Sequence, residues 1–209
     1  MNSVHFESGL SEEIAIVLSC PGKDEEEATP QGPAKGQTGT NLNAILNILT
    51  NDFNRSGFTR TDIVVTNSWA QVEYIKKTQR AEAELQQVLG VSNLNRLASE
   101  IENISKYIVA CGENAKVSVS MLEYAGKLKE GVKIIYIKHL GSQAINLNVS
   151  TDIDGNEIVT YSRAADKPDH ETRSLVKIEN DNMTKRLTVV AHEVNQQLTR
   201  RLNGTKTVG

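Results

Sequence analysis

The sequence IAIVLSCPG at residues 14–22 is a short apolar run that ends at a Pro-Gly pair. A run of this kind is typical of a buried strand that leads into a loop. Three more runs have the same character, namely DIVVTN at 62–67, YIVAC at 107–111 and VKIIYI at 132–137. The sequence therefore predicts four buried strands.

The segments between these strands have apolar residues at helical spacing. The first interval has an apolar stripe, with Thr40 or Asn41 as a candidate cap, and the stripe consists of Leu42, Ile45, Leu46 and Leu49. Further helices are expected at about 80–89, from Ser92 onward, and at 113–124. Alternating strands and helices favour right-handed crossovers and a parallel sheet. We therefore expect an α/β fold, a three-layer α/β/α sandwich around a four-stranded parallel sheet.

The C-terminal part of the chain has a different pattern. Residues 148–163, with the Asp-Gly-Asn turn at 154–156, predict a β-hairpin, and 174–179 is a further candidate strand. We interpret 148–182 as a β-hairpin insertion. An apolar stripe at helical spacing then predicts a closing C-terminal helix at 183–203.

Length and hydropathy suit a single compact unit. A chain of 209 residues can form one sizeable core, so 1–209 is interpreted as a single domain, with a monomer favoured. No stretch approaches the roughly 20 apolar residues that span a bilayer, and the first residues lack the segments of a secretory signal. We therefore expect a cytoplasmic protein that does not act at a membrane.

The composition gives little support for a metal or a cofactor. Two cysteines, Cys20 and Cys111, cannot supply the thiolates of a zinc or iron-sulfur site, and the histidines lack metal-ligand spacing. We expect neither a metal nor a cofactor. The net charge of −3 argues against a protein coated in positive charge, but a nucleic-acid site needs only a local patch. Residues 183–209 are rich in Lys and Arg and are either such a patch or a solvated helix face.

The candidate site lies where the predicted strands end. Loops at the carboxyl ends of parallel strands converge on one crevice. The four strands are followed by polar, turn-forming segments, which are SCPG at 19–22, NS at 67–68, CG at 111–112 and HLGS at 139–142. We expect these segments to surround the working site.

A glycine-rich loop, GPAKGQTG at 32–39, precedes the first predicted helix. Such loops can cradle phosphates. This one matches neither G-x-x-x-x-G-K-[ST] nor G-x-G-x-x-G, which disfavours a nucleoside-triphosphatase or a dinucleotide site. The alternative is a loop that needs glycine only for its backbone conformation.

Taken in order, these segments resemble the uracil-DNA glycosylase superfamily, particularly its thermophile-type bacterial and archaeal branch, over roughly residues 14–147. In that family the first strand ends in a Pro-Gly turn, an acidic stretch follows, and a P-F-V-G-x-A-G loop opens the first helix. The matching segments here are Pro21-Gly22, 24–27 and 33–39. The family's second strand ends in T-N, as at 66–67, and its fourth in H-P-S, compared with HLGS at 139–142.

The resemblance implies a role for each matched residue. Cleavage of an N-glycosidic bond builds positive charge on the sugar and negative charge on the departing base. His139 would donate a hydrogen bond to that base, and Asn67 would pair with the edge of a flipped-out base. Asp24 or Glu25 would position or activate water. His139 as a structural residue and Asn67 as a turn cap remain the alternatives.

The remaining matched positions would contact the base or the DNA backbone. The base pocket would be completed by Cys20, Pro21, Gly22 and Ala34. Backbone phosphates would be approached by the amides of Gly36, Gly39, Gly141 and Ser142.

Two departures from the family pattern affect the expected substrate. The branch carries an acid two residues before the Pro-Gly pair, where this chain has Ser19, and a Phe that stacks on uracil, where this chain has Ala34. Base-aromatic stacking contributes about 1–3 kcal/mol, so its loss weakens the binding of a small base unless another ring, such as Trp69 or Tyr74, replaces it. A bulky or modified base becomes the expected substrate. The iron-sulfur cysteines of the branch are also absent.

Two functions follow as hypotheses. The first is a monofunctional DNA glycosylase that hydrolyses the N-glycosidic bond of a flipped-out uracil or modified pyrimidine, with DNA as its partner. A bulky modified base in foreign, phage-type DNA would fit the lost ring, which points to repair or antiviral defence. The second is a non-catalytic protein that retains the fold and binds nucleic acid or a nucleotide, which Ser19 in place of the acid favours.

Overall fold

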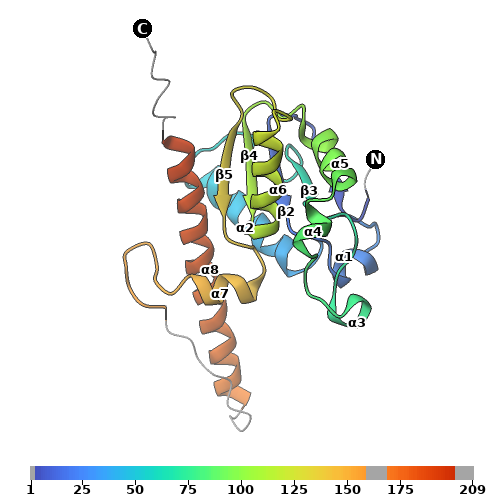
Figure 1. Cartoon of the computed structure of the whole chain (residues 1–209). Helices are drawn as coiled ribbons and strands as arrows, with labels where there is room; N and C mark the ends of the chain where they lie inside the picture. The colour runs from blue at the N-terminus through green and yellow to red at the C-terminus, as the bar shows by residue number, and fades with distance from the viewer. Residues whose placement is uncertain (1–2, 159–168, 201–209) are drawn as a thin grey trace.

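The computed structural model describes residues 3–158 and 169–200, with only the course of the backbone over 169–175. It is a mixed α/β structure built on one five-stranded, mostly parallel sheet (Figure 1). The strands are β1 (Phe6–Glu7), β2 (Ile14–Leu18), β3 (Val64–Asn67), β4 (Tyr107–Cys111) and β5 (Lys133–Ile137). The helices are α1 (Lys23–Glu27), α2 (Gln37–Asn51), α3 (Ile75–Thr78), α4 (Leu85–Val88), α5 (Val91–Ile101), α6 (Glu113–Tyr124), α7 (Ser142–Asn148) and α8 (Asp169–Thr199).

The sheet has the order β1-β3-β2-β4-β5, with β2 at its centre. Strands β2 to β5 run parallel, so the four predicted strands and their direction are confirmed. The prediction of a four-stranded sheet is wrong, because β1 adds a fifth strand antiparallel to β3. A two-residue strand is too short to show periodicity in the sequence, and only its pairing with Val65 and Thr66 defines it.

Two apolar clusters cover the opposite faces of the sheet. Successive side chains of a strand point to opposite faces, so Ile14, Ile16 and Leu18 of β2 pack with α2, α7 and α8. Ala15 and Val17 of the same strand pack with α5 and α6. A strand buried on both faces is continuously apolar, which is why the 14–18 run lacks alternation.

The segment after β5 differs most from the prediction. Residues 169–182, which include the candidate strand at 174–179, belong to α8, so that strand is wrong. The closing helix begins at Asp169 rather than at 183, while 201–203 lie outside the described residues. The predicted hairpin is reduced, within the described residues, to one antiparallel bridge between Thr151 and Glu157, and 159–163 lie outside them.

The other helices also correct the sequence analysis in part. The helix at 113–124 is confirmed as α6, and α5 begins one residue before Ser92. The segment at 80–89 forms only the single turn of α4, and the first long helix begins at Gln37, with Gly36 at its cap instead of Thr40 or Asn41. The sequence analysis did not predict α1, α3 or α7. All three are short, and α1 and α7 lie at strand exits, where local hydrogen bonds decide the conformation.

Helix α8 packs along α2 and β5 and continues past α7 (Figure 1). It also covers the free edge of β5, because the Gln197 side chain accepts from the Tyr136 N–H (3.2 Å) and donates to the Tyr136 carbonyl (3.0 Å). Arg186, from the basic C-terminal segment, is buried and donates to the carbonyl of Val149, so it is not a phosphate-facing residue. No helix within 3–158 or 169–200 is both long enough and apolar enough to cross a bilayer.

We predict that Leu187→Ala lowers the free energy of unfolding by about 2–4 kcal/mol, because Leu187 of α8 is buried in the cluster on the α2 face. Chemical denaturation followed by circular dichroism measures this change. The matched control is the exposed Gln196 on the same helix, where Gln196→Ala should change stability by less than about 0.5 kcal/mol. Equal effects of the two substitutions would contradict the packing of α8 on the sheet.

Candidate functional site

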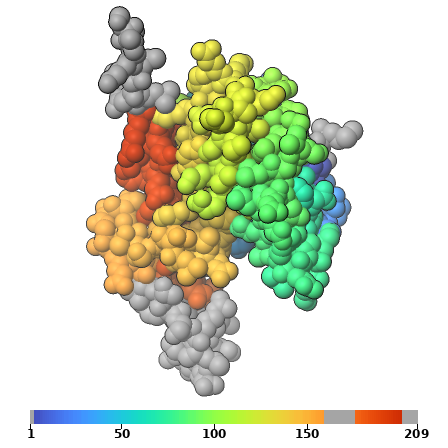
Figure 2. All heavy atoms as spheres, viewed as in Figure 1, coloured from blue at the N-terminus to red at the C-terminus, as the bar shows by residue number. Residues whose placement is uncertain are grey.

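A cavity of about 610 Å³ lies at the carboxyl ends of the central strands. Figure 2 shows the recess between the orange surface around α7 and the green surface around α4. Most of the predicted site residues line it, namely Cys20, Gly22, Asp24, Glu25, Ala34, Gly36, Asn67, His139, Gly141 and Ser142. Pro21 and Gly39 are not among its lining residues. The parallel strands therefore bring together side chains that are up to about 120 positions apart in the chain.

The His139 ring is held in one tautomer by the backbone. Its Nδ1 accepts a hydrogen bond from the Gly141 N–H at 2.9 Å, which requires a lone pair on Nδ1. The neutral ring therefore carries its proton on Nε2. That atom lies 3.8 Å from Oε1 of Glu82, another residue of the cavity lining. His139 thus presents an N–H donor to the cavity.

Two neighbours fix the place of the His139 loop. Gly112, at the end of β4, has a φ of +91°, and a Cβ there would lie only 3.2 Å from Cβ of His139. Asn41 of α2 is buried and donates to the Leu140 carbonyl at 2.7 Å. Glycine leaves the space that His139 occupies, and Asn41 holds the loop against α2.

Glu25 joins the two loops that form one side of the cavity. Its Oε2 accepts from the Gly22 N–H at 2.9 Å, and its Oε1 accepts from the N–H groups of Lys35 (3.0 Å) and Gly36 (3.4 Å). The side chain is buried, and both oxygens are used by the backbone. The structure therefore favours a positioning role for Glu25 over water activation.

Asp24 is an exposed carboxylate of the same helix, and it lines the cavity without a hydrogen bond within the described residues. It packs directly on Gly36, since a Cβ added to Gly36 would lie 2.1 Å from Oδ2 of Asp24. A side chain at position 36 would therefore displace the Asp24 carboxylate. Of the two acids expected to handle water, Asp24 is the one whose oxygens are available.

The amides expected to bind phosphate are mostly occupied. The N–H of Gly36 donates to Glu25, that of Gly39 to the Gly36 carbonyl, and that of Gly141 to His139. Ser142 is the exception, since its N–H has no partner within the described residues. The other unpaired amides on the cavity also lie in first turns of helices, and they include those of Gln37 and Thr38 in α2. An α-helix leaves its first N–H groups unpaired, so the candidate phosphate donors are the predicted Ser142 and, one residue beyond Gly36, Gln37 and Thr38.

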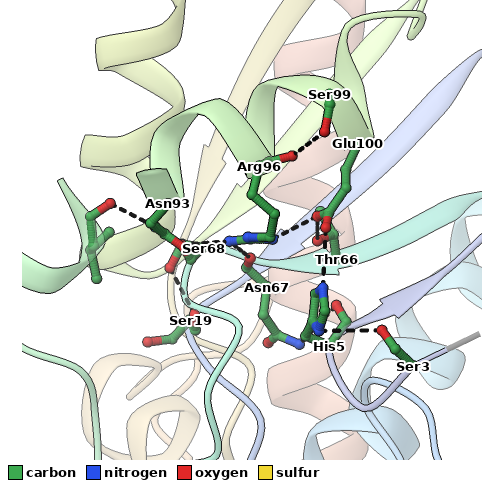
Figure 3. Close-up of polar contacts among 11 residues, drawn as sticks. Ser3, His5, Ser19, Thr66, Asn67, Ser68, Asn93, Arg96, Ser99 and Glu100 are labelled. Carbon is green, nitrogen blue, oxygen red and sulfur yellow. Dashed lines mark hydrogen bonds and ion pairs between the residues drawn. The ribbon is translucent and has the colours of Figure 1, made fainter. Parts of the chain in front are cut away.

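Asn67 is fixed at the end of β3 by a polar network (Figure 3). Its backbone N–H and its Nδ2 both donate to the His5 carbonyl, at 3.1 and 3.3 Å. Arg96 donates to the carbonyls of Asn67 and Ser68 and is itself held by Glu100 at 2.6 Å. Within the described residues, Oδ1 of Asn67 has no hydrogen-bond partner, so it is available to a ligand.

The opposite wall contains acids that the sequence analysis missed. Glu73 is buried and accepts from Trp69 Nε1 (3.2 Å) and from Arg80 (3.1 Å), and its N–H donates to the Pro21 carbonyl (2.9 Å). Glu82 is half exposed and faces His139. Neither follows a strand directly, so the strand-exit rule could not select them.

The base-binding positions form an uncharged part of the lining. Burial raises the pKa of the Cys20 thiol to about 11, so the thiol is protonated near neutral pH. Ala34 lines the cavity with a left-handed φ of 52°. The described lining includes no Phe, Tyr or Trp, and the rings of Trp69 and Tyr74 instead hydrogen-bond to Glu73 and Glu26. Neither ring replaces the aromatic face that Ala34 lacks.

Within the described part of the chain, no group of three or more His, Cys, Asp or Glu side chains could hold a metal ion. No protein-family model and no curated protein matches the chain.

We predict that Glu25→Ala lowers the free energy of unfolding by about 2–3 kcal/mol, because three backbone N–H groups lose their acceptor. Thermal and urea denaturation measure the loss. Glu27 on the same helix is the control, since its carboxylate is 62% exposed and forms an ion pair with the exposed Lys23. Glu27→Ala should leave stability nearly unchanged, and a similar loss in both variants would refute the role given to Glu25.

We predict that Cys20 reacts with iodoacetamide roughly 100-fold more slowly than free cysteine at pH 7, because the thiolate is the nucleophile and a pKa of about 11 makes it scarce. The rate should rise with each unit of pH up to about 11. Mass spectrometry over a pH series measures it. Cys111 is fully buried, so Cys20→Ser should abolish the reaction, and a rate that is high and flat near pH 7 would contradict the prediction.

Proposed function

We propose that this protein is a monofunctional DNA glycosylase that hydrolyses the N-glycosidic bond of a flipped-out uracil or modified pyrimidine. The observation that carries the proposal is the convergence of His139, Asp24 and Asn67 on one cavity, with the His139 proton directed to Nε2. The helices on both faces of the sheet support the three-layer sandwich of the superfamily that the sequence resembles.

The cavity suits the charges that develop in this reaction. As the bond between the base and C1′ breaks, the base gains negative charge and the sugar gains positive charge. The Nε2–H of His139 would donate to the base, and the carboxylate of Asp24 would lie by the sugar and orient the water that attacks C1′. The water oxygen then bonds to C1′, and its proton leaves for solvent or for the departing base.

Two parts of the cavity lining would bind the substrate, namely its uncharged side chains and the first turn of α2. Asn67 offers Oδ1 and one N–H to the edge of the base. The free amides of Gln37 and Thr38 would receive a flanking phosphate. A volume of about 610 Å³ without an aromatic ring leaves room for a base larger than uracil. A bulky modified pyrimidine in foreign, phage-type DNA is therefore the substrate that we favour. The protein would act on it in the cytoplasm, as a monomer.

One observation favours a second function, a non-catalytic protein that binds nucleic acid or a nucleotide. Ser19 stands where the related branch has an acid, and the Glu25 carboxylate is fully used by the backbone. Asp24 would then be the only free acid of that helix on the cavity. Such a protein would bind its ligand without breaking a bond.

The two functions separate in one assay. Single- and double-stranded oligonucleotides containing uracil, 5-hydroxymethylcytosine or glucosylated cytosine are incubated with the protein, and alkali then cleaves the strand at abasic sites. Glycosylase activity gives cleavage only after alkali, whereas binding without release on every substrate supports the second function. Strand cleavage without alkali would exclude a monofunctional enzyme.

We predict that His139→Ala slows base release by about 100- to 1000-fold, because the departing base loses its hydrogen-bond donor. Single-turnover rates with the best substrate measure the effect. The control is His192 of α8, which stacks on Phe53 and does not line the cavity. His192→Ala should retain the wild-type rate, and a His139→Ala enzyme of normal activity would remove His139 from the mechanism.

A further inference from the structure

The hydroxyl of Ser19 is buried at the cavity, and no partner among the described residues meets hydrogen-bond geometry with it, although it is close enough to the Cys20 thiol to lower the pKa of that group. The residue is 2% exposed and directly follows β2. Its carbonyl accepts from the Ser68 hydroxyl at 2.7 Å (Figure 3) and from the Trp69 N–H at 3.0 Å. These contacts fix the backbone of Ser19, so its side chain stays at the cavity and does not turn out to solvent.

An unpaired buried hydroxyl lowers stability, because it has lost its hydrogen bonds to water and gained none in return. Alanine at this position would avoid the loss. Unsatisfied polar groups of this kind are rare in folded proteins and call for an explanation, such as a ligand that supplies the missing bond. Ser19 lines a cavity that could hold such a ligand.

The depth of each polar group indicates what that ligand contacts. The most buried polar side chains of the lining that lack a full set of partners are Ser19 and Asn67, at 2% and 1% exposure. They lie on adjacent strands, because Leu18 and Asn67 are paired in register. The carboxylates of Asp24 and Glu82 and the ring of His139 are all more exposed. The cavity thus has a neutral polar floor, Ser19 and Asn67, below a charged rim.

We propose that the Ser19 hydroxyl is a specificity-determining group that hydrogen-bonds a nucleobase seated on this floor beside Asn67. The choice of a nucleobase as the ligand rests on the proposed function. A base is neutral and carries carbonyl and N–H groups around its edge, which a hydroxyl can match as donor or acceptor. The sugar and phosphates of the nucleotide remain at the charged rim.

The test combines stability with binding in the Ser19→Ala variant. Removal of an unsatisfied hydroxyl should leave the Tm unchanged or raise it by about 1–3 °C. The same change should weaken the binding of a free base about 5- to 10-fold. The probes are uracil, cytosine and thymine, titrated at millimolar concentrations and followed by protein-observed NMR. A residue with a purely structural role would lower the Tm and leave binding intact.

Ser118→Ala is the matched control. Ser118 is also buried, but its hydroxyl donates to the Ala115 carbonyl at 3.0 Å in α6, away from the cavity. Its loss should lower the Tm and leave base binding unchanged.

The proposal for Ser19 is overturned if wild type binds none of the three bases, if Ser19→Ala binds them equally well, or if Ser19→Ala is clearly less stable. Base binding that depends on Ser19, together with no abasic sites on any oligonucleotide, would support Ser19 and reject the glycosylase. Abasic sites formed at equal rates by wild type and Ser19→Ala would support the glycosylase and reject Ser19.

Discussion

The carboxylate of Glu25 is the contact on which the arrangement of the cavity depends. It links the turn after β2, through Gly22, to the loop before α2, through Lys35 and Gly36. Those two loops carry Asp24 and the free amides of α2, and Asp24 packs against Gly36. One buried side chain therefore sets the distance between the candidate acid and the candidate phosphate site, and it does so by accepting from the backbone instead of contacting a ligand.

Local apolar patterns in the sequence were enough to predict the four parallel strands of the sheet, but not the conformation of the segment that follows them. The runs at 14–19, 62–67 and 107–111 contain buried strands, because apolar residues fill both faces of the sheet there. The run at 132–137 forms the edge strand β5, in which only Ile135 is buried. The segment SLVKIE at 174–179 is partly apolar too, yet it is helical as part of α8. A long-range contact decides that outcome: α8 packs along α2 and β5, and the helix extends from there toward its N-terminus.

The candidate site was predictable to the level of strand exits, since parallel strands end at one edge. That rule located His139, Asn67 and the loop at 19–22. The strand-exit rule could not tell which polar groups are already hydrogen-bonded within the protein. The hydrogen bonds of Glu25 to backbone amides and of Gly141 to His139 depend on backbone angles that the local sequence does not determine. The rule did not select Glu73 and Glu82, because both lie in the long connection after β3 and neither directly follows a strand.

The Gln197 side chain has a further consequence at the other side of the sheet. An unpaired strand edge is a template on which a second polypeptide can polymerise. Through one amide group, Gln197 imitates the peptide of a neighbouring strand and saturates the outward N–H and carbonyl of Tyr136 in β5. Any incoming chain must first break both of those bonds. A side chain of the closing helix thus occupies one of the positions on the β5 edge at which a second strand could pair.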